Sequence, residues 1–162
     1  MNKVKRFTLI LLPSISLFFC LFSCNNGTIF SESKPIKHEK WNSKDTLKFL
    51  FQVEDTLSAY EFLVNIRNTT EYKYSNFFLF IHILFPDKKR ADDTLECLLA
   101  DEMGKWLGKG HGKIRDNMIL YRKNILFPRK GMYKVLMVHG MREENISGIS
   151  DIGFMVKKQQ HR

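Results

Sequence analysis

Hydrophobic and polar residues alternate along most of the chain after residue 45. The clearest alternation lies in residues 47–53 and 60–67, where nearly every second side chain is apolar. Successive side chains of a β-strand point to opposite faces of its sheet, so a period of two places one apolar set on a buried face. No long segment shows the 3.6-residue period of an amphipathic helix. The pattern predicts strands that each cover a core with one face.

Further strands are predicted in the second half of the chain. Residues 77–85 (FFLFIHILF) are nearly all apolar, which is typical of a central strand covered on both faces. Residues 94–100 carry apolar side chains at every second position, although a helix over 91–103 is the alternative for this segment. The remaining predicted strands span residues 118–127, 132–138 and 149–156.

About seven strands separated by turn residues indicate one all-β fold. We predict an antiparallel β-sandwich, of immunoglobulin-like or jelly-roll-like kind, and the spacing of the strands does not choose between the two. Tyr133 follows Gly131 at the start of an alternating strand and resembles the corner tyrosine of such sandwiches. Residues 104–113 contain four glycines, which predicts a loop or a strongly bent ribbon.

The first residues have the pattern of an export signal. Lys3, Lys5 and Arg6 precede residues 7–21, which carry no charge. A helix that spans a membrane needs about 20 apolar residues, so this stretch is short for one and fits a secretory signal better. An uncleaved membrane anchor is the alternative interpretation.

The next residues are similar to a bacterial lipobox. In Leu21-Phe22-Ser23-Cys24, an apolar residue and a small residue stand before a cysteine at the usual places, although Phe22 is bulkier than is common there. We therefore predict a lipoprotein signal peptide over 1–23, a lipidated tether over 24–44 and a β-sandwich domain over 45–162. Each buried CH₂ contributes about 0.8 kcal/mol, so two or three acyl chains on Cys24 suffice for stable anchoring in membrane lipid.

Charge and cysteine content narrow the function classes. The formal charge of +9 falls to +6 when the three cations of the signal leave. The remaining cations are dispersed and accompany no nucleic-acid-reading motif, so we expect no nucleic-acid partner. Cys97 would be the one cysteine besides Cys24 in the mature chain, which predicts no internal disulfide and a thiol that packs as a small hydrophobe.

Motifs of enzyme and metal sites are not found in the sequence. It contains no HExxH or paired-histidine spacing, no GxSxG and no P-loop. We therefore expect no catalytic residues, no metal and no cofactor.

An ordered series of blocks follows the lipobox. The most specific is Leu99-Ala100-Asp101 with Gly104-Lys105-Trp106-Leu107-Gly108, and others are RNT at 67–69, YKYSNFFL at 72–79, GMR at 140–142 and ISDIG at 149–153. Together they resemble the GldH family of gliding-motility lipoproteins of Bacteroidetes. The resemblance implies an envelope lipoprotein linked to gliding or to type IX secretion, and it carries over one chemical role, lipid attachment at Cys24.

The resemblance therefore predicts a non-catalytic assembly or scaffold component whose partners are other envelope motility or secretion lipoproteins. The alternative is a periplasmic glycan- or peptidoglycan-binding module, which two or three coplanar exposed aromatic side chains would favour. Asn25 is not followed by the acidic run associated with surface export in this phylum. We expect the periplasmic face of the envelope, with the outer membrane favoured over the inner.

Residues 104–113 hold the first candidate partner-binding side chains. Trp106 is flanked by Lys105 and Lys109, and tryptophan is a common anchor of protein interfaces. The alternative, which we favour, is that the glycines permit unusual backbone angles while Trp106 packs on the core.

Arg142 is the second candidate, in a polar segment after a predicted strand. It lies either in a solvated turn or in an ion pair with Asp101 or Asp151.

Asp-Thr-Leu occurs three times and is similar to an O-glycosylation pattern of Bacteroidetes envelope proteins. The threonines are Thr46, Thr56 and Thr94. Ordinary turn chemistry before a strand is the favoured explanation.

Overall fold

The computed structural model describes residues 27–159, so the predicted signal peptide and Cys24 lie outside the described residues. Within them, no helix is long and apolar enough to cross a membrane. The elements in chain order are β1 (Thr28–Pro35), η2 (Lys37–Glu39), β2 (Lys40–Asn42), β3 (Leu47–Val53), β4 (Ala59–Thr69), β5 (Asn76–Leu84), β6 (Arg90–Leu98), β7 (Ile114–Leu126), β8 (Gly131–His139), β9 (Asn145–Ser147) and β10 (Ile149–Lys158).

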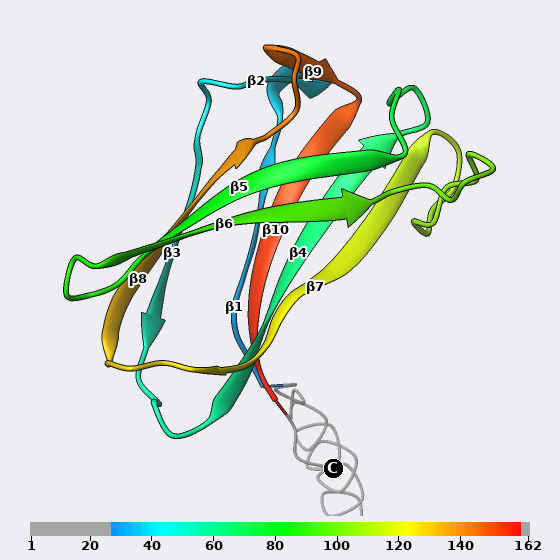
Figure 1. Ribbon diagram of the computed structural model, residues 1–162. Helices are drawn as coiled ribbons and strands as arrows, with labels where there is room; N and C mark the ends of the chain where they lie inside the picture. The colour runs from blue at the N-terminus through cyan, green and yellow to red at the C-terminus, as the bar shows by residue number, and fades with distance from the viewer. Residues whose placement is uncertain (1–26, 160–162) are drawn as a thin grey trace, which may run out of the picture.

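Eight of the strands form two antiparallel sheets that pack face to face (Figure 1). The first sheet has the order β1-β10-β4-β7, and the second has the order β3-β8-β5-β6. The short strands β2 and β9 pair with each other at one end. The predicted antiparallel β-sandwich is confirmed, and the predicted strand over 94–100 is β6, so the alternative helix over 91–103 is wrong.

The core lies between the two sheets and is rich in aromatic rings. Phe49 on β3 and Phe154 on β10 come from opposite sheets, are both at most 1% exposed, and have ring centroids 5.9 Å apart. Cys97 is fully buried, as predicted, and burial raises the pKa of its thiol to about 12. The Tyr133 hydroxyl donates to the backbone oxygen of Arg129 at 2.8 Å, which confirms the predicted corner tyrosine.

The predicted tether is wrong for residues 28–44. Residues Thr28–Pro35 form β1, which runs antiparallel to β10 in the first sheet. Trp41 of β2 is 1% exposed, and its indole N–H donates to the backbone oxygen of Asp45 at 2.9 Å. Residues 28–44 therefore belong to the folded domain, because Trp41 lies in its core and Phe30 packs against it.

The prediction that residues 77–85 are covered on both faces is also wrong. The inward side chains of β5 are buried, but Phe80, on its outer face, is 44% exposed. Apolar residues on both faces of a strand thus do not require a layer on each side. The outer face of the second sheet is partly apolar and open in the described part of the chain.

The two ends of the sandwich differ in what they carry (Figure 1). We call one the terminal end, since β1 begins and β10 finishes there, beside the turn 54–58 and the loop 127–130. The opposite, distal end carries the β2–β9 ribbon and the loops 70–75, 99–113 and 140–144. All candidate partner-binding residues from the sequence lie at the distal end.

Candidate partner-binding loops and an edge pocket

The distal loop 99–113 is stabilised by hydrogen bonds between its own residues. The amide of Leu107 donates to the backbone oxygen of Leu99 at 2.9 Å, and the Asp101 carboxylate accepts the Lys105 amide at 2.8 Å. Trp106 is half-buried and packs against the core, whereas its neighbour Lys105 is exposed. The tryptophan therefore fixes the loop while the cation beside it stays accessible.

Two glycines of this loop are required by close approach to β7. A Cβ on Gly110 would lie 2.2 Å from the backbone oxygen of Ile114, and one on Gly108 would lie 2.7 Å from the Asn117 side-chain oxygen. Lys109, between them, is exposed and exchanges backbone hydrogen bonds with Asp116 of β7. The glycines thus let the loop lie against the sheet edge, with Lys109 displayed outward.

Arg142 is exposed in the turn after β8 and lines a shallow hollow with Tyr74 and Glu143. The Tyr74 hydroxyl donates to the Glu143 carboxylate, which raises the pKa of Tyr74. The suggested ion pairs of Arg142 are not formed. Asp151 instead accepts from Ser33 at 2.7 Å and pairs with Arg67, and Asp101 accepts backbone amides of its own loop.

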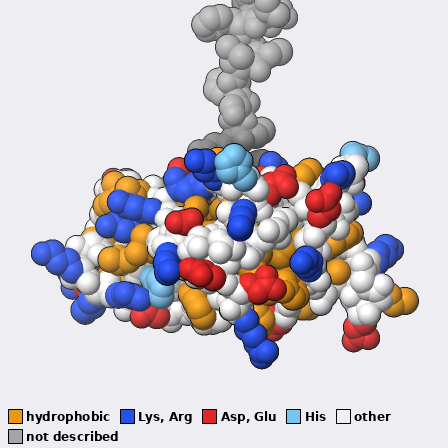
Figure 2. Space-filling view, turned by 90° about the horizontal axis from the view of Figure 1, so that it is seen from above, with side chains coloured by type: hydrophobic (Ala, Val, Ile, Leu, Met, Phe, Trp, Pro, Cys, Tyr) orange, Lys and Arg blue, Asp and Glu red, His pale blue; other side chains and the backbone are white. Residues whose placement is uncertain are grey.

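The candidate residues share one end of the molecule but not one pocket. Lys109 lines a hollow with Leu107 and Met118, while Arg142 lines the separate hollow beside Tyr74. Figure 2, seen from above the distal end, shows basic and acidic side chains mixed over this surface. The structure places these side chains where a partner can reach them, and their role in binding stays a prediction.

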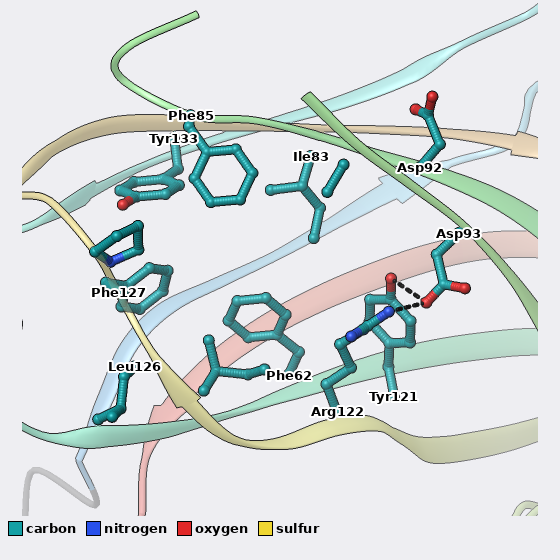
Figure 3. A pocket seen from close by; sticks show the side chains of 13 residues that line it. Phe62, Ile83, Phe85, Asp92, Asp93, Tyr121, Arg122, Leu126, Phe127 and Tyr133 are labelled. Atoms are coloured by element: carbon teal, nitrogen blue, oxygen red, sulfur yellow. Dashed lines mark hydrogen bonds and ion pairs between the residues drawn. The ribbon is translucent and has the colours of Figure 1, made fainter. Parts of the chain in front are cut away.

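A feature that the sequence did not predict is a pocket of about 170 Å³ between β6 and β7 (Figure 3). Its wall is apolar and aromatic, and its mouth carries three polar side chains. The labelled lining residues are Phe62, Ile83, Phe85, Leu126, Phe127 and Tyr133 along the wall, with Asp93, Tyr121 and Arg122 at the mouth and Asp92 beside it.

The mouth of this pocket is a hydrogen-bonded group. The Tyr121 hydroxyl donates to the Asp93 carboxylate at 3.0 Å, and the Arg122 guanidinium donates to the same oxygen at 2.5 Å. The bond from Arg122 lowers the pKa of Asp93 against the opposing effect of burial, while burial raises the pKa of Tyr121 to about 12. At neutral pH the group therefore holds a carboxylate, a guanidinium and a neutral phenol, an arrangement suited to bridging strands rather than to transferring protons.

The backbone of β4 and β7 helps to explain why the pocket exists and why the hydrophobic pattern of the sequence did not predict it. The register between β4 and β7 shifts on both sides of Phe62, and Asn124 of β7 has a left-handed φ of 57°. Such bulges bend a strand locally and increase its twist. A period-two pattern shows neither the bulge nor the contact of β7 with Asp93, so no signal in the sequence located this pocket.

The three Asp-Thr-Leu sites differ in accessibility. Thr46 and Thr94 are exposed, and Thr56 is half-buried. The Asp55 carboxylate accepts the Leu57 amide at 2.9 Å, as expected for ordinary turn chemistry. Glycosylation at these threonines stays a prediction.

Comparison with known proteins identifies relatives over nearly the whole chain. The sequence profile of the GldH lipoprotein family matches residues 28–156. The "Gliding motility lipoprotein GldH homolog" of Christiangramia forsetii is 32% identical over 161 residues, which is 91% of this chain and 98% of the relative. The "Gliding motility lipoprotein GldH" of Flavobacterium johnsoniae is 30% identical, covering 97% of this chain and 99% of the relative.

Solved structures are more distant. The structure of infectious bursal disease virus Gx strain aligns at a TM-score of 0.34 and 11% identity, covering 84% of this chain and 31% of the viral chain. A similarity of this size supports no statement about function.

Proposed function

The chain belongs to the GldH lipoprotein family, and we propose that it is a lipid-anchored, non-catalytic assembly or scaffold component of an envelope machinery for gliding motility or type IX secretion. The observation that carries the proposal is the extent of the match. The family profile spans residues 28–156, from the first strand of the sandwich almost to the end of its last. Two relatives of nearly equal length bear the name of a gliding motility lipoprotein.

The proposed anchor is Cys24, acylated after removal of residues 1–23. The lipobox of residues 21–24 and membership in a lipoprotein family support this assignment. Acylation would place the domain on an envelope membrane, and we propose the periplasmic face, with the outer membrane ahead of the inner.

The proposed partner surface is the distal end with Trp106, Lys105, Lys109 and Arg142. Its partners are other envelope lipoproteins of the same machinery. The position of these residues at the end opposite to the start of β1 supports the proposal, because an anchor just before β1 leaves the distal end free to meet another protein.

The chemistry of the described residues supports a non-catalytic role. Burial raises the pKa of Cys97 to about 12, so its thiol is protonated at neutral pH and is a poor nucleophile. The alternative of glycan binding requires two or three coplanar exposed aromatic rings. Phe80 is the one exposed aromatic side chain among residues 27–159, so the geometry does not favour that alternative.

Crosslinking in native membranes tests the proposal. A photoreactive amino acid in place of Lys105 should crosslink the chain to motility or secretion lipoproteins, identified by mass spectrometry. The pair Lys105→Glu and Lys109→Glu should reduce copurification of these proteins by about tenfold, the effect of losing roughly 1.4 kcal/mol of binding energy.

Lys48→Glu with Lys123→Glu is the matched control, because it makes the same charge change at exposed lysines outside the distal loops. Equal copurification by both double variants would contradict the proposed surface. Recovery of the Cys24→Ala chain in the membrane fraction with an intact N-terminus would contradict the proposed anchor.

A further inference from the structure

The link between the proposed lipid and the folded domain is short. Gly27 is already held by the last strand, since the Lys158 amide donates to its backbone oxygen at 2.7 Å. Three peptide units separate Cys24 from Gly27, and a fully extended chain spans at most about 3.6 Å per residue. The backbone of Cys24 can therefore lie at most about 11 Å from Gly27, which keeps its acyl chains near this end of the domain.

The turn 54–58 lies at the same end as Gly27, on the other side of the last strand β10. The Lys158 ammonium donates to the Asp55 carboxylate at 2.9 Å, and the Gln159 amide donates to the backbone oxygen of Ala59 at 2.8 Å. These bonds join both sides of the turn to the strand that holds Gly27. Any bilayer that Cys24 enters therefore faces this turn.

An apolar side chain stands at the tip of this turn. Leu57 is 92% exposed, although the turn around it is held by three hydrogen bonds from Leu57 and Ser58 to Asp55. Leu126, opposite Ala59 in the adjacent strand, is 63% exposed. Transfer of an exposed leucine from water into an apolar environment is favourable. The short link to Cys24 would keep Leu57 close to the apolar interior of the bilayer.

The charged side chains at the terminal end are of a kind that can lie in the lipid headgroup layer around Leu57. Asp55 is paired with Lys158, whereas Glu54, at the start of the turn, is exposed and accepts from the Gln52 side-chain amide at 2.9 Å. Lys130, in the loop 127–130, is exposed, and Lys157 lies at the end of β10. Cations at this depth are attracted to anionic phospholipid.

We propose that the terminal end of the sandwich rests in the headgroup layer of a phospholipid bilayer, with Leu57 inserted beside the acyl chains of Cys24. The proposal rests on the proposed lipidation of Cys24 and adds a fixed orientation to it. The distal loops then point away from the membrane, toward proteins rather than lipid. A flexible tether of about 20 residues would allow any orientation, and β1 removes that freedom.

Site-specific fluorescence on the full acylated chain tests this orientation. Leu57→Cys and Met103→Cys are matched positions, because the native side chains are 92% and 93% exposed at opposite ends of the sandwich. Each is labelled with an environment-sensitive dye, and the chain is reconstituted in vesicles of phosphatidylethanolamine and phosphatidylglycerol. The parent chain, in which Cys97 is buried, measures background labelling.

The dye at position 57 should shift to shorter emission wavelength on reconstitution and should be quenched by lipids carrying a nitroxide near the headgroup. The dye at position 103 should keep the spectrum it has in water. Equal, water-like spectra at both positions would overturn the proposal, as would equal quenching at both.

Flotation of the same vesicles separates this proposal from the lipid anchor. If the labelled chain floats with vesicles and the Cys24→Ala chain does not, the anchor holds, and the spectra decide the orientation alone. If the chain fails to float, or if Cys24→Ala floats equally well, the proposed lipidation fails, and the orientation that depends on it fails with it.

Discussion

Where β1 faces β3, an aromatic ring fills the gap between the sheets, whereas a hydrogen-bonded carboxylate bridges the gap where β7 faces β6. On the first side, the Phe30 ring lies 5.4 Å from Phe51 and 6.3 Å from Phe154, measured between ring centroids. On the second side, Tyr121 and Arg122 both donate to Asp93. We call these the packed side and the bridged side.

Besides the bulge in the pairing of β4 with β7, the inward side chains of β6 contribute to the difference. From the terminal end toward the distal end, their burial increases from Ala91, which is exposed, through Asp93 and Leu95, which are half-buried, to Cys97, which is fully buried. The inward face of β6 is therefore least covered near its terminal end, and the pocket of about 170 Å³ lies there. Small or polar side chains on β6 and the bulged course of β7 are therefore both found on the open side.

The largest expected effect is on the packed side. Phe49→Ala removes a fully buried ring that contacts Phe30 and Phe154. We expect the free energy of unfolding to fall by about 3–5 kcal/mol, because the lost transfer energy and the cavity add together. Urea unfolding followed by tryptophan fluorescence measures this change.

Phe80→Ala is the control, because it removes the same side chain from the exposed outer face of β5. We expect a loss below about 1 kcal/mol there. Equal losses from the two variants would show that Phe30 and its neighbours do not form a packed edge.

A smaller effect is expected on the bridged side. Asp93→Ala leaves the Tyr121 hydroxyl and the Arg122 guanidinium without their shared acceptor. Water can partly replace it, because the side chains of Asp93 and Arg122 are 34% and 49% exposed. We expect a loss of about 1–2 kcal/mol in the free energy of unfolding.

Asp92→Ala is the matched control, since its carboxylate is 58% exposed and pairs with Arg90 and His82 on the outer face. An exposed pair of this kind contributes about 0–1 kcal/mol. A larger loss for Asp92→Ala than for Asp93→Ala would contradict the bridging role of Asp93.

The pH dependence gives a second measurement of the same bridge. Arg122 lowers the pKa of Asp93 in the folded state, and the unfolded value is about 3.9. The stabilisation is therefore complete above the unfolded pKa and is lost as the pH falls through the folded pKa. The difference in unfolding free energy between the native chain and Asp93→Ala should narrow below about pH 4. A constant difference from pH 7 to pH 3 would indicate that the Asp93 carboxylate is not responsible.

The sequence predicted the long strands that have one apolar face, and it missed the edge strand β1 and the three-residue strands β2 and β9. Residues 47–53 were predicted as a strand and form β3, because their apolar side chains alternate. In β1, by contrast, Phe30 is followed at the next alternating positions by Glu32 and Lys34, and Lys34 lies over the Phe49 ring, 5.5 Å from its centroid. An edge strand with one large apolar side chain on its inward face shows no hydrophobic period, so its pairing with β10 could not be predicted.

The candidate loops and the pocket also differ in whether a local sequence pattern could predict them. Four glycines indicated the loop that carries Trp106, because glycine permits backbone angles and approaches that other residues do not. The choice of Arg67 rather than Arg142 as the partner of Asp151 depends on which strands become neighbours. The bridge from Asp93 to Tyr121 likewise joins residues 28 positions apart, and no local pattern contains that information.

The smallest expected effect comes from Ala91→Ile, a substitution that would make the bridged side more like the packed side. Ala91 pairs with Ile83 in the register of β5 and β6, and both line the pocket. Ala91→Ile adds apolar volume there and a β-branched side chain to a strand, so we expect a gain of about 0.5–1 kcal/mol in the free energy of unfolding. Thr94→Ile, an exposed outward position on the same strand, separates strand propensity from filling of the pocket. A gain confined to Ala91→Ile would mean that one small side chain keeps this side open. A loss would mean that the bulged course of β7 fixes the shape of the pocket, so that added volume overpacks it.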